Sequence, residues 1–246
     1  MDRLIWTAVS GMSAAMARQR MIASNMANAQ TIGFRAEVMQ FTPITLQGES
    51  LEVRAMTDGA VRGARMEAGA MHGTGRALDV AMQGEALLSV QAADGSEAYT
   101  RRGDLSLSPQ GLLINGEGYA VLGEDGPISL PPGSDISIGE DGAVLARDRA
   151  NPEAPPQPVG RIKLASWRGS QIEKGLDGLF RVTGGGVLPA DPEARVLPAT
   201  LEQSNVRPSE VLIQMVEAQR LYDMRTKLVA QAKELDEGGA SLMRLT

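Results

Sequence analysis

Apolar residues near the N-terminus recur at alternating steps of three and four positions. This is the a/d spacing of helices that pack along their length. It predicts a helix of about 24 residues, roughly 36 Å long at 1.5 Å per residue. The residues of this N-terminal seam are Ile5, Ala8, Met12, Ala15, Gln19, Ile22 and Met26.

The end of the chain carries a second pattern of the same kind. Pro208 suits a first helical turn, Glu210 suits the positive end of the helix dipole, and Gly238 and Gly239 end the run. Two rows of residues seven positions apart predict that this helix also packs along its length. They form the C-terminal seam, which contains Leu221, Leu228 and Leu235 in one row and Met215, Tyr222 and Val229 in the other.

Between the two helices the pattern changes to that of β-strands. Over residues 85–146, short apolar stretches alternate with turn dipeptides such as Asp94-Gly95 and Asn115-Gly116, which predicts an antiparallel meander or small barrel. Residues 35–80 show no firm period, and we interpret them as extended chain with a possible hairpin.

The predicted fold class is therefore α+β. Long N- and C-terminal helices would form a coiled-coil-like stem, and an antiparallel all-β body would lie between them in the chain. The predicted segments are an N-terminal helix and turn at 1–34, a connector at 35–80, a β domain at 81–200 and a C-terminal helix at 201–246. An alternative reading has two amphipathic helices packing on one globular core.

Composition narrows the class of protein. The 246 residues are 43% hydrophobic, which supports a real core, and carry a formal charge of −6 with a pI near 5.0. That charge argues against a partner with a phosphate backbone, so no nucleic acid is expected.

No apolar run reaches the roughly 18–20 residues that span a bilayer, so no membrane insertion is expected. The apolar spacing also continues through the only candidate signal-cleavage point, so we expect no cleaved signal peptide.

Residues for chemistry are scarce. The chain has no cysteine and one histidine, His72. No nucleophile elbow, phosphate-binding loop or paired-histidine motif is present. We therefore predict a protein that is not an enzyme, with no catalytic residues, no cofactor and no metal site.

The stretch "SNMANAQTIGF", residues 24–34, ends the first helical pattern. Asparagine tolerates the left-handed conformation, so Asn25 and Asn28 are predicted to close the helix. Gly33 permits a turn that other residues avoid. Phe34 would then fold back as a hydrophobic anchor.

Both ends of the chain resemble the rod and hook axial proteins of the bacterial flagellum. Those proteins open with a Ser-Gly pair, a helical stretch, an Asn-x-Ala-Asn turn and Thr-x-Gly-Phe or Tyr, and they share a closing motif. The opening "MDRLIWTAVSGM" is most similar to the proximal-rod members of the family. The motif positions are Ser10, Gly11, Asn25, Ala27, Asn28, Thr31, Gly33 and Phe34, and then Leu201, Glu202, Ser204, Asn205, Val206, Gln219 and Arg220.

The resemblance implies a structural subunit of the flagellar basal-body rod, the periplasmic shaft that transmits torque. Such a subunit would be exported by the flagellar type III apparatus without cleavage. It would assemble through its terminal helices with copies of itself and with neighbouring rod proteins. Two alternatives stay open: another axial protein of the family, from the distal rod or hook, and a non-flagellar periplasmic scaffold with a coiled-coil stem.

Overall fold

The computed structural model describes residues 2–45, 55–131, 133–149, 151 and 153–243. The chain forms two compact units. The helical unit contains residues 1–27, 37–63 and 207–246, and the β unit contains residues 28–36 and 64–206. The chain therefore enters the β unit twice, and its two ends both belong to the helical unit.

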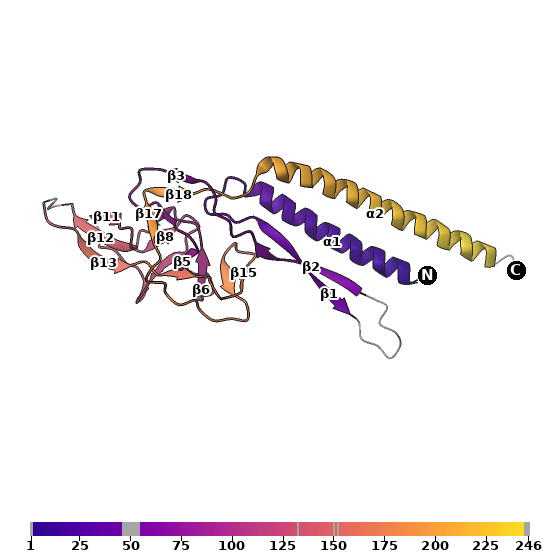
Figure 1. Cartoon of the computed structure of the whole chain (residues 1–246), viewed down its shortest axis with the longest axis horizontal. Coiled ribbons are helices and arrows are strands. Elements are labelled where there is room, and N and C mark those ends of the chain that lie inside the picture. Colours follow the sequence, from indigo (N-terminus) through magenta and orange to yellow (C-terminus); the bar gives the residue numbers. More distant parts are fainter. Residues whose placement is uncertain (1, 46–54, 132, 150, 152, 244–246) are drawn as a thin grey trace. The chain divides into compact units, whose positions relative to one another are not determined.

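Two antiparallel helices form the larger part of the helical unit (Figure 1). Helix α1 spans Asp2–Ala27 and helix α2 spans Pro208–Met243. The two helices pack against each other along α1, and the Arg225 guanidinium of α2 donates a hydrogen bond to the Gly11 carbonyl of α1. Glu210 in the first turn of α2 complements the positive end of the helix dipole, as predicted.

A two-stranded ribbon completes the helical unit. Strand β1 spans Glu37–Thr45 and pairs with β2, Ala55–Ala64. The Asn25 side chain of α1 donates to the Glu37 carbonyl at 3.0 Å and accepts from the Glu37 N–H at 2.8 Å, so it takes the place of a neighbouring strand. The ribbon falls within residues 35–80, which the sequence analysis interpreted as extended chain with a possible hairpin.

The β unit is built from short antiparallel strands. A nine-stranded sheet has the order β15-β16-β6-β5-β9-β8-β7, with β10 paired to β9 and β14 paired to β5. Three smaller sheets have the orders β11-β12-β13, β17-β4 and β18-β3. The bounds are β3 Met71–Gly73, β4 Val80–Met82, β5 Ala86–Gln91, β6 Glu97–Thr100, β7 Leu105–Leu107, β8 Leu113–Asn115, β9 Ala120–Gly123, β10 Gly126–Pro127, β11 Ser134–Ile138, β12 Ala143–Asp148, β13 Gln157–Arg161, β14 Leu164–Ser166, β15 Ile172–Lys174, β16 Phe180–Val182, β17 Val196–Pro198 and β18 Thr200–Glu202.

Aliphatic side chains from these sheets form the main core of the β unit. Leu88, Val90, Leu105 and Val121 are fully buried in it, together with apolar residues of the three-stranded sheet. A second, smaller cluster surrounds Tyr99. The scarcity of aromatic residues is thus met by Leu, Val, Ile and Ala, which pack at high density between short strands.

The predicted fold class is wrong. The described residues form eighteen strands and two helices, so the chain is mostly β, and the helices do not form a coiled-coil stem. In the helical unit α1 also bonds the ribbon, and the seam residues Gln19, Met215 and Leu228 are exposed. The physical reason is that heptad spacing shows that one helix face is buried without showing what covers it. The β-rich body agrees with the sequence pattern.

Candidate functional site

The segments that enter and leave the β unit lie side by side. We name residues 28–36 the entry segment and residues 201–206 the exit segment. The Gly33 N–H donates to the Glu202 carbonyl at 2.8 Å, and the Asn205 N–H donates to the Phe34 carbonyl at 3.2 Å. The structure therefore brings the end of the N-terminal motif and the start of the C-terminal motif together at one junction.

Gly33 has the geometry that the sequence predicted. Its φ is +67°, which favours glycine, and it packs directly on backbone. A Cβ at this position would lie 2.4 Å from the carbonyl carbon and oxygen of Arg101 and 2.6 Å from the amide nitrogen of Arg102. Only a residue without a side chain fits this approach.

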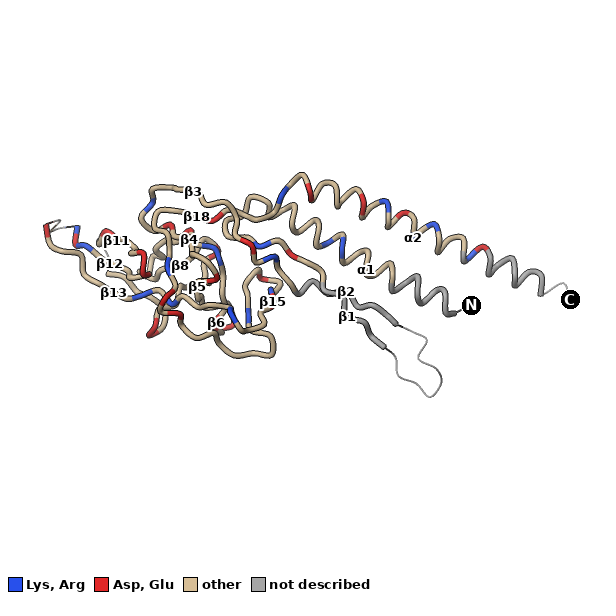
Figure 2. The backbone as a smooth tube through the Cα atoms, in the orientation of Figure 1, with Lys and Arg blue, Asp and Glu red and all other residues tan. Residues whose placement is uncertain are grey.

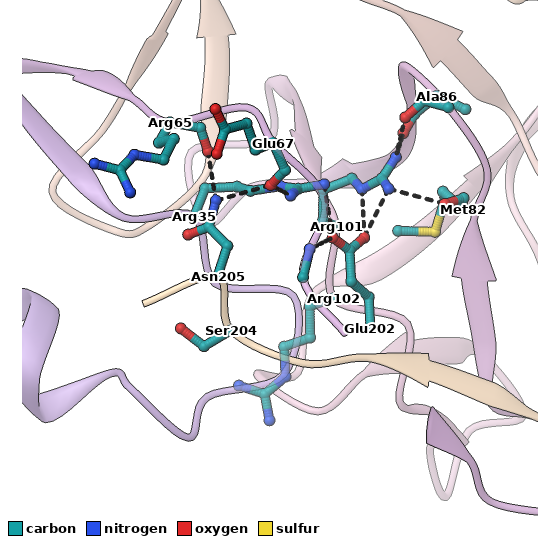
Figure 3. Close-up of polar contacts among 12 residues, drawn as sticks. Arg35, Arg65, Glu67, Met82, Ala86, Arg101, Arg102, Glu202, Ser204 and Asn205 are labelled. Carbon is teal, nitrogen blue, oxygen red and sulfur yellow. Dashed lines mark hydrogen bonds and ion pairs between the residues drawn. The ribbon is translucent and has the colours of Figure 1, made fainter. Parts of the chain in front are cut away.

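Two arginines share one buried carboxylate at the junction (Figure 3). The Arg35 Nη2 lies 2.7 Å from Glu202 Oε1, and the Arg101 Nη2 lies 2.7 Å from Glu202 Oε2. The Arg101 Nε donates to the same Oε2 at 2.8 Å, and the Gly69 N–H donates to Oε1 at 2.8 Å. All three side chains are at most 2% exposed, so we name them the buried ion triad.

The triad holds two positive charges against one negative charge. Burial lowers the pKa of the Arg35 guanidinium, Glu202 raises it, and the like charge of Arg101 lowers it further. Arginine nevertheless stays protonated in proteins, so the excess charge must be met by backbone dipoles. Arg101 donates to the carbonyls of Met82, Gly84 and Ala86, at 2.8, 3.0 and 2.5 Å.

Asn205 joins the entry segment to the rest of the junction. Its Oδ1 accepts a hydrogen bond from the Ala36 N–H at 2.7 Å. Its Nδ2 donates to the carbonyls of Arg65 and Glu67, at 2.7 and 2.8 Å (Figure 3). One amide side chain thus uses its acceptor and both donors, which only Asn or Gln could do at this position.

Lys174 of β15 holds the aromatic residue of the entry segment. Its Nζ lies 3.5 Å from the centroid of the Phe34 ring and donates to the Arg35 carbonyl at 3.0 Å. Phe34 is half-buried. A cation therefore lies over the ring that was predicted to act as a hydrophobic anchor, and the contact gains from the quadrupole of the ring as well as from burial.

Of the two asparagines, only Asn28 lies at the end of the helix. Asn25 lies inside α1 and bonds the backbone of β1, so it does not close the helix. Asn28 follows the helix, and its Oδ1 accepts from the Thr31 hydroxyl at 3.0 Å while its carbonyl accepts from the Thr31 N–H at 3.1 Å. The turn after the helix is therefore an Asn28–Thr31 turn.

The remaining motif residues are spread over both units. Leu201 and Val206 are buried in the exit segment, and the Ser204 hydroxyl accepts from the Val206 N–H at 3.2 Å. Ala27, Gln219 and Arg220 are exposed on the helices. Ser10 lies in α1, but its side chain is outside the part of the structure that is described.

The seam positions also divide. Ala15 and Ile22 are buried. Gln19, Met215 and Leu228 are exposed. The half-buried positions are Met12, Met26, Leu221, Tyr222 and Val229. The side chains of Ile5, Ala8 and Leu235 lie outside the described part of the structure. Among the side chains of α2 that the structure describes, Val211 and Ala218 are buried, and neither lies in the two predicted rows.

Helix α2 also exposes large apolar side chains on the side away from its buried residues, where they alternate with the charged residues Glu217, Arg220, Asp223 and Lys227. Five side chains, each 45–62% exposed, lie within an arc of about 160° at 100° per residue, opposite Val211, Ala218 and Arg225. We name them the outer stripe: Leu212, Ile213, Val216, Met224 and Leu228. Large apolar groups exposed together on one helix face are typical of an interaction surface.

The described residues offer little for catalysis. They contain no group of three His, Asp or Glu side chains arranged for a metal ion. An open hollow of about 620 Å³ in the β unit includes Glu85 and Arg168, which pair with each other at 2.8 Å. His72 is exposed on β3, opposite Leu201 of β18.

No helix in the described ranges combines the length and the apolar character that a membrane crossing needs.

Sequence reasoning missed three of the residues that build the junction. Arg35, Arg101 and Lys174 lie in different elements, and a charged residue in a sequence normally indicates a solvated surface. The available signals were weak: Arg35 directly follows the Gly-Phe motif, and Arg101 directly follows a predicted strand region. Neither signal identifies Glu202 as the partner.

Comparison with known proteins matches three segments of the chain to flagellar families. Residues 5–35 match the family described as flagella basal body rod protein. Residues 81–146 match the flagellar hook protein FlgE/F/G D1 domain, and residues 198–242 match the C-terminal family of the flagellar basal body rod FlgEFG proteins.

Full-length relatives agree with these matches. The chain is 40% identical to the flagellar basal-body rod protein FlgF of Salmonella typhimurium, over 98% of each chain. It is 40% identical to FlgF of Escherichia coli over 95% of each chain. It is 30% identical to the flagellar basal-body rod protein FlgG of Caulobacter vibrioides, over 96% of this chain and 97% of that protein.

Proposed function

Because the chain belongs to the flagellar basal-body rod protein family, with full-length relatives of the FlgF type, we propose that it is a structural subunit of the proximal rod. Its role is mechanical: subunits pack into the shaft of the basal body, and no chemical step is involved. The greater identity to FlgF than to FlgG favours the proximal rod over the distal rod.

The observation that carries the assembly mechanism is the outer stripe of α2. Fully burying an aliphatic or Met side chain contributes roughly 1.5–3 kcal/mol, and these five are about half exposed in the single chain. Covering them with neighbouring subunits would contribute on the order of 5 kcal/mol before ordering costs. The stripe therefore supports assembly through the terminal helices.

The charge distribution also supports assembly through the helical unit. Nineteen Asp and Glu and thirteen Lys and Arg lie in the β unit, so it carries the whole net charge of −6. The helical unit holds eleven of each sign and is formally neutral, and Figure 2 shows both signs interleaved along α2. Copies that meet through neutral helical units avoid the repulsion that acidic β units would cause.

Family membership also supports the partners and the location. The partners are copies of this chain and other rod proteins, and the location is the periplasmic part of the basal body. The flagellar type III apparatus exports the subunit without cleavage. The match to the rod family begins at residue 5, so the residues that a signal peptidase would remove belong to the matched domain.

A complementation experiment tests the proposal. A strain that lacks the gene receives the wild type, the double variant Ile213→Glu/Met224→Glu, or the control Leu176→Glu. Leu176 is fully exposed in the β unit, so the control adds a carboxylate to an apolar surface residue away from the stripe.

We expect the double variant to fold, as judged by circular dichroism of the purified protein, and to be exported without restoring motility. Electron cryotomography should then show basal bodies that stop at the inner part of the rod, whereas the control should show complete rods. A motile double variant would exclude the outer stripe as the assembly surface. A complete rod without a hook in the deletion strain would instead indicate a hook protein.

A further inference from the structure

The entry segment depends on the buried ion triad more strongly than the exit segment does. We propose that Glu202 is a shared counter-ion that makes docking of the entry segment conditional on prior docking of the exit segment. This inference concerns the order in which the β unit closes, and it does not depend on the proposed rod function.

The exit segment has its own backbone contacts with the rest of the β unit. Strand β18 pairs with β3, with Leu201 opposite His72 and Glu202 opposite Met71. The Gln203 N–H donates to the Ala70 carbonyl at 2.8 Å. None of these contacts involves residues 28–36, so the exit segment can stay in place when the entry segment is absent.

The entry segment has two backbone contacts outside the exit segment: Lys174 donates to the Arg35 carbonyl, and the Arg65 N–H donates to the Ala36 carbonyl. Its other backbone bonds reach Glu202 and Asn205 through Gly33, Phe34 and Ala36. Its side chain Arg35 is the least supported member of the triad. Besides Glu202, the Arg35 guanidinium donates to the Glu67 carbonyl, and its buried Nε has no hydrogen-bond partner.

The two arginines therefore depend on Glu202 to different degrees. Without the carboxylate, Arg101 keeps three backbone carbonyls as acceptors, whereas Arg35 keeps one. An uncompensated buried charge is strongly unfavourable, so Arg35 would leave its position and take the entry segment with it. Without Arg35, the pair of Arg101 and Glu202 is charge-balanced and stays buried.

Coupling between two docking events is reciprocal in free energy. The proposed asymmetry rests on the strand pairing of the exit segment with β3 and on the three backbone carbonyls that hold Arg101 without Glu202. Ribosomal synthesis delivers residues 28–36 long before residues 201–206. The triad would thus keep the entry segment undocked until the chain is complete, and then order both segments at one site.

Hydrogen exchange measured by mass spectrometry on the full-length monomer tests this order. Three variants are compared with the wild type: Glu202→Gln, Arg35→Gln and the control Asp135→Asn. Glutamine keeps the size of Glu202 and an acceptor for the Gly69 N–H. Asp135 pairs with Arg149 at 2.6 Å on the exposed face of β11, so the control removes a carboxylate from an ion pair that is not buried.

For Glu202→Gln, we expect exchange in peptides covering residues 28–36 to rise about 100-fold or more. For Arg35→Gln, we expect the same rise in 28–36, while residues 201–206 stay within about tenfold of the wild type. The control should change neither segment.

Two results would overturn the proposal. One is an entry segment that stays protected in Glu202→Gln. The other is an exit segment that loses protection in Arg35→Gln as fully as the entry segment does. If Glu202→Gln does not fold, the double variant Arg101→Gln/Glu202→Gln replaces it, because it leaves Arg35 as the one charge of the triad. We again expect residues 28–36 to lose protection from exchange. Continued protection of these residues would contradict the proposal.

Discussion

Replacing Gly33 by alanine probes the closest backbone contact of the junction. Two separate penalties act there: a φ of +67° and a Cβ that would meet the Arg101 backbone at 2.4 Å. Gly75 has a φ of +76° with no atom within 4 Å of a Cβ, so it carries the first penalty alone. Gly69 carries only the second, because its Cβ would lie 1.9 Å from the Gln203 carbonyl oxygen and its φ is not in the left-handed region.

The magnitudes follow from these geometries. A left-handed conformation costs an L-residue about 1–2 kcal/mol, and overpacking against backbone costs about 1–3 kcal/mol. Gly75→Ala should therefore lose about 1–2 kcal/mol, Gly69→Ala about 1–3 kcal/mol, and Gly33→Ala about 2–5 kcal/mol. Alanine also restricts the unfolded chain, and that gain is common to the three variants and cancels between them.

Urea unfolding followed by tryptophan fluorescence measures these losses. Trp167 packs against the Tyr99 cluster and reports on the β unit, so the series is made in a Trp6→Phe background to remove the other tryptophan. With an m-value of about 2 kcal/mol per M, Gly33→Ala should lower the midpoint by about 1–2.5 M and Gly75→Ala by about 0.5–1 M. Equal midpoints for these two variants would refute the close approach of Gly33 to Arg101.

Three further predictions concern other parts of the chain. Tyr99→Phe leaves the buried N–H of Leu188 without its acceptor and should cost about 1–3 kcal/mol in urea unfolding, whereas a change below about 0.5 kcal/mol would contradict that role. A hydrogen bond from Arg181 lowers the pKa of Asp177, so this carboxylate stabilises the fold above its unfolded pKa of about 4, and the benefit disappears as pH falls through the lower folded value. Asp177→Asn should therefore be less stable than the wild type at pH 7 but equal to it below about pH 2, and a difference independent of pH would count against the pairing. Ile22→Ala removes a side chain that is 1% exposed and should cost the helical unit about 2–5 kcal/mol in thermal unfolding followed at 222 nm; an unchanged transition would show that Ile22 is not buried in solution.

The resemblance of both chain ends to axial proteins predicted the family, and comparison with full-length relatives confirmed it. Local patterns predicted much of the secondary structure. The strand signals of the middle region correspond to real strands, and Gly33 has the positive φ that its motif requires. These features depend on neighbouring residues, because periodicity and turn preference act over a few positions.

The sequence predicted only some of the residues that form the candidate site. Glu202 and Asn205 were found as motif positions, but their partners were not. Arg35 and Arg101 are separated from Glu202 by 167 and 101 positions in the chain, and nothing in the sequence near either arginine specifies a carboxylate so far away. Lys174 was missed for the same reason, since its contact with Phe34 joins distant strands and turns.

The fold-class error has a related origin. The spacing of Ala15 and Ile22 correctly indicated that one face of α1 is buried, but it could not show that Asn25 would bond a β ribbon. The sequence by itself determined where helices, strands and turns form, because those choices are made by local conformational preference. Only the tertiary structure decided which faces meet and which charges pair, because burial and ion pairing depend on residues that come together only when the whole chain has folded.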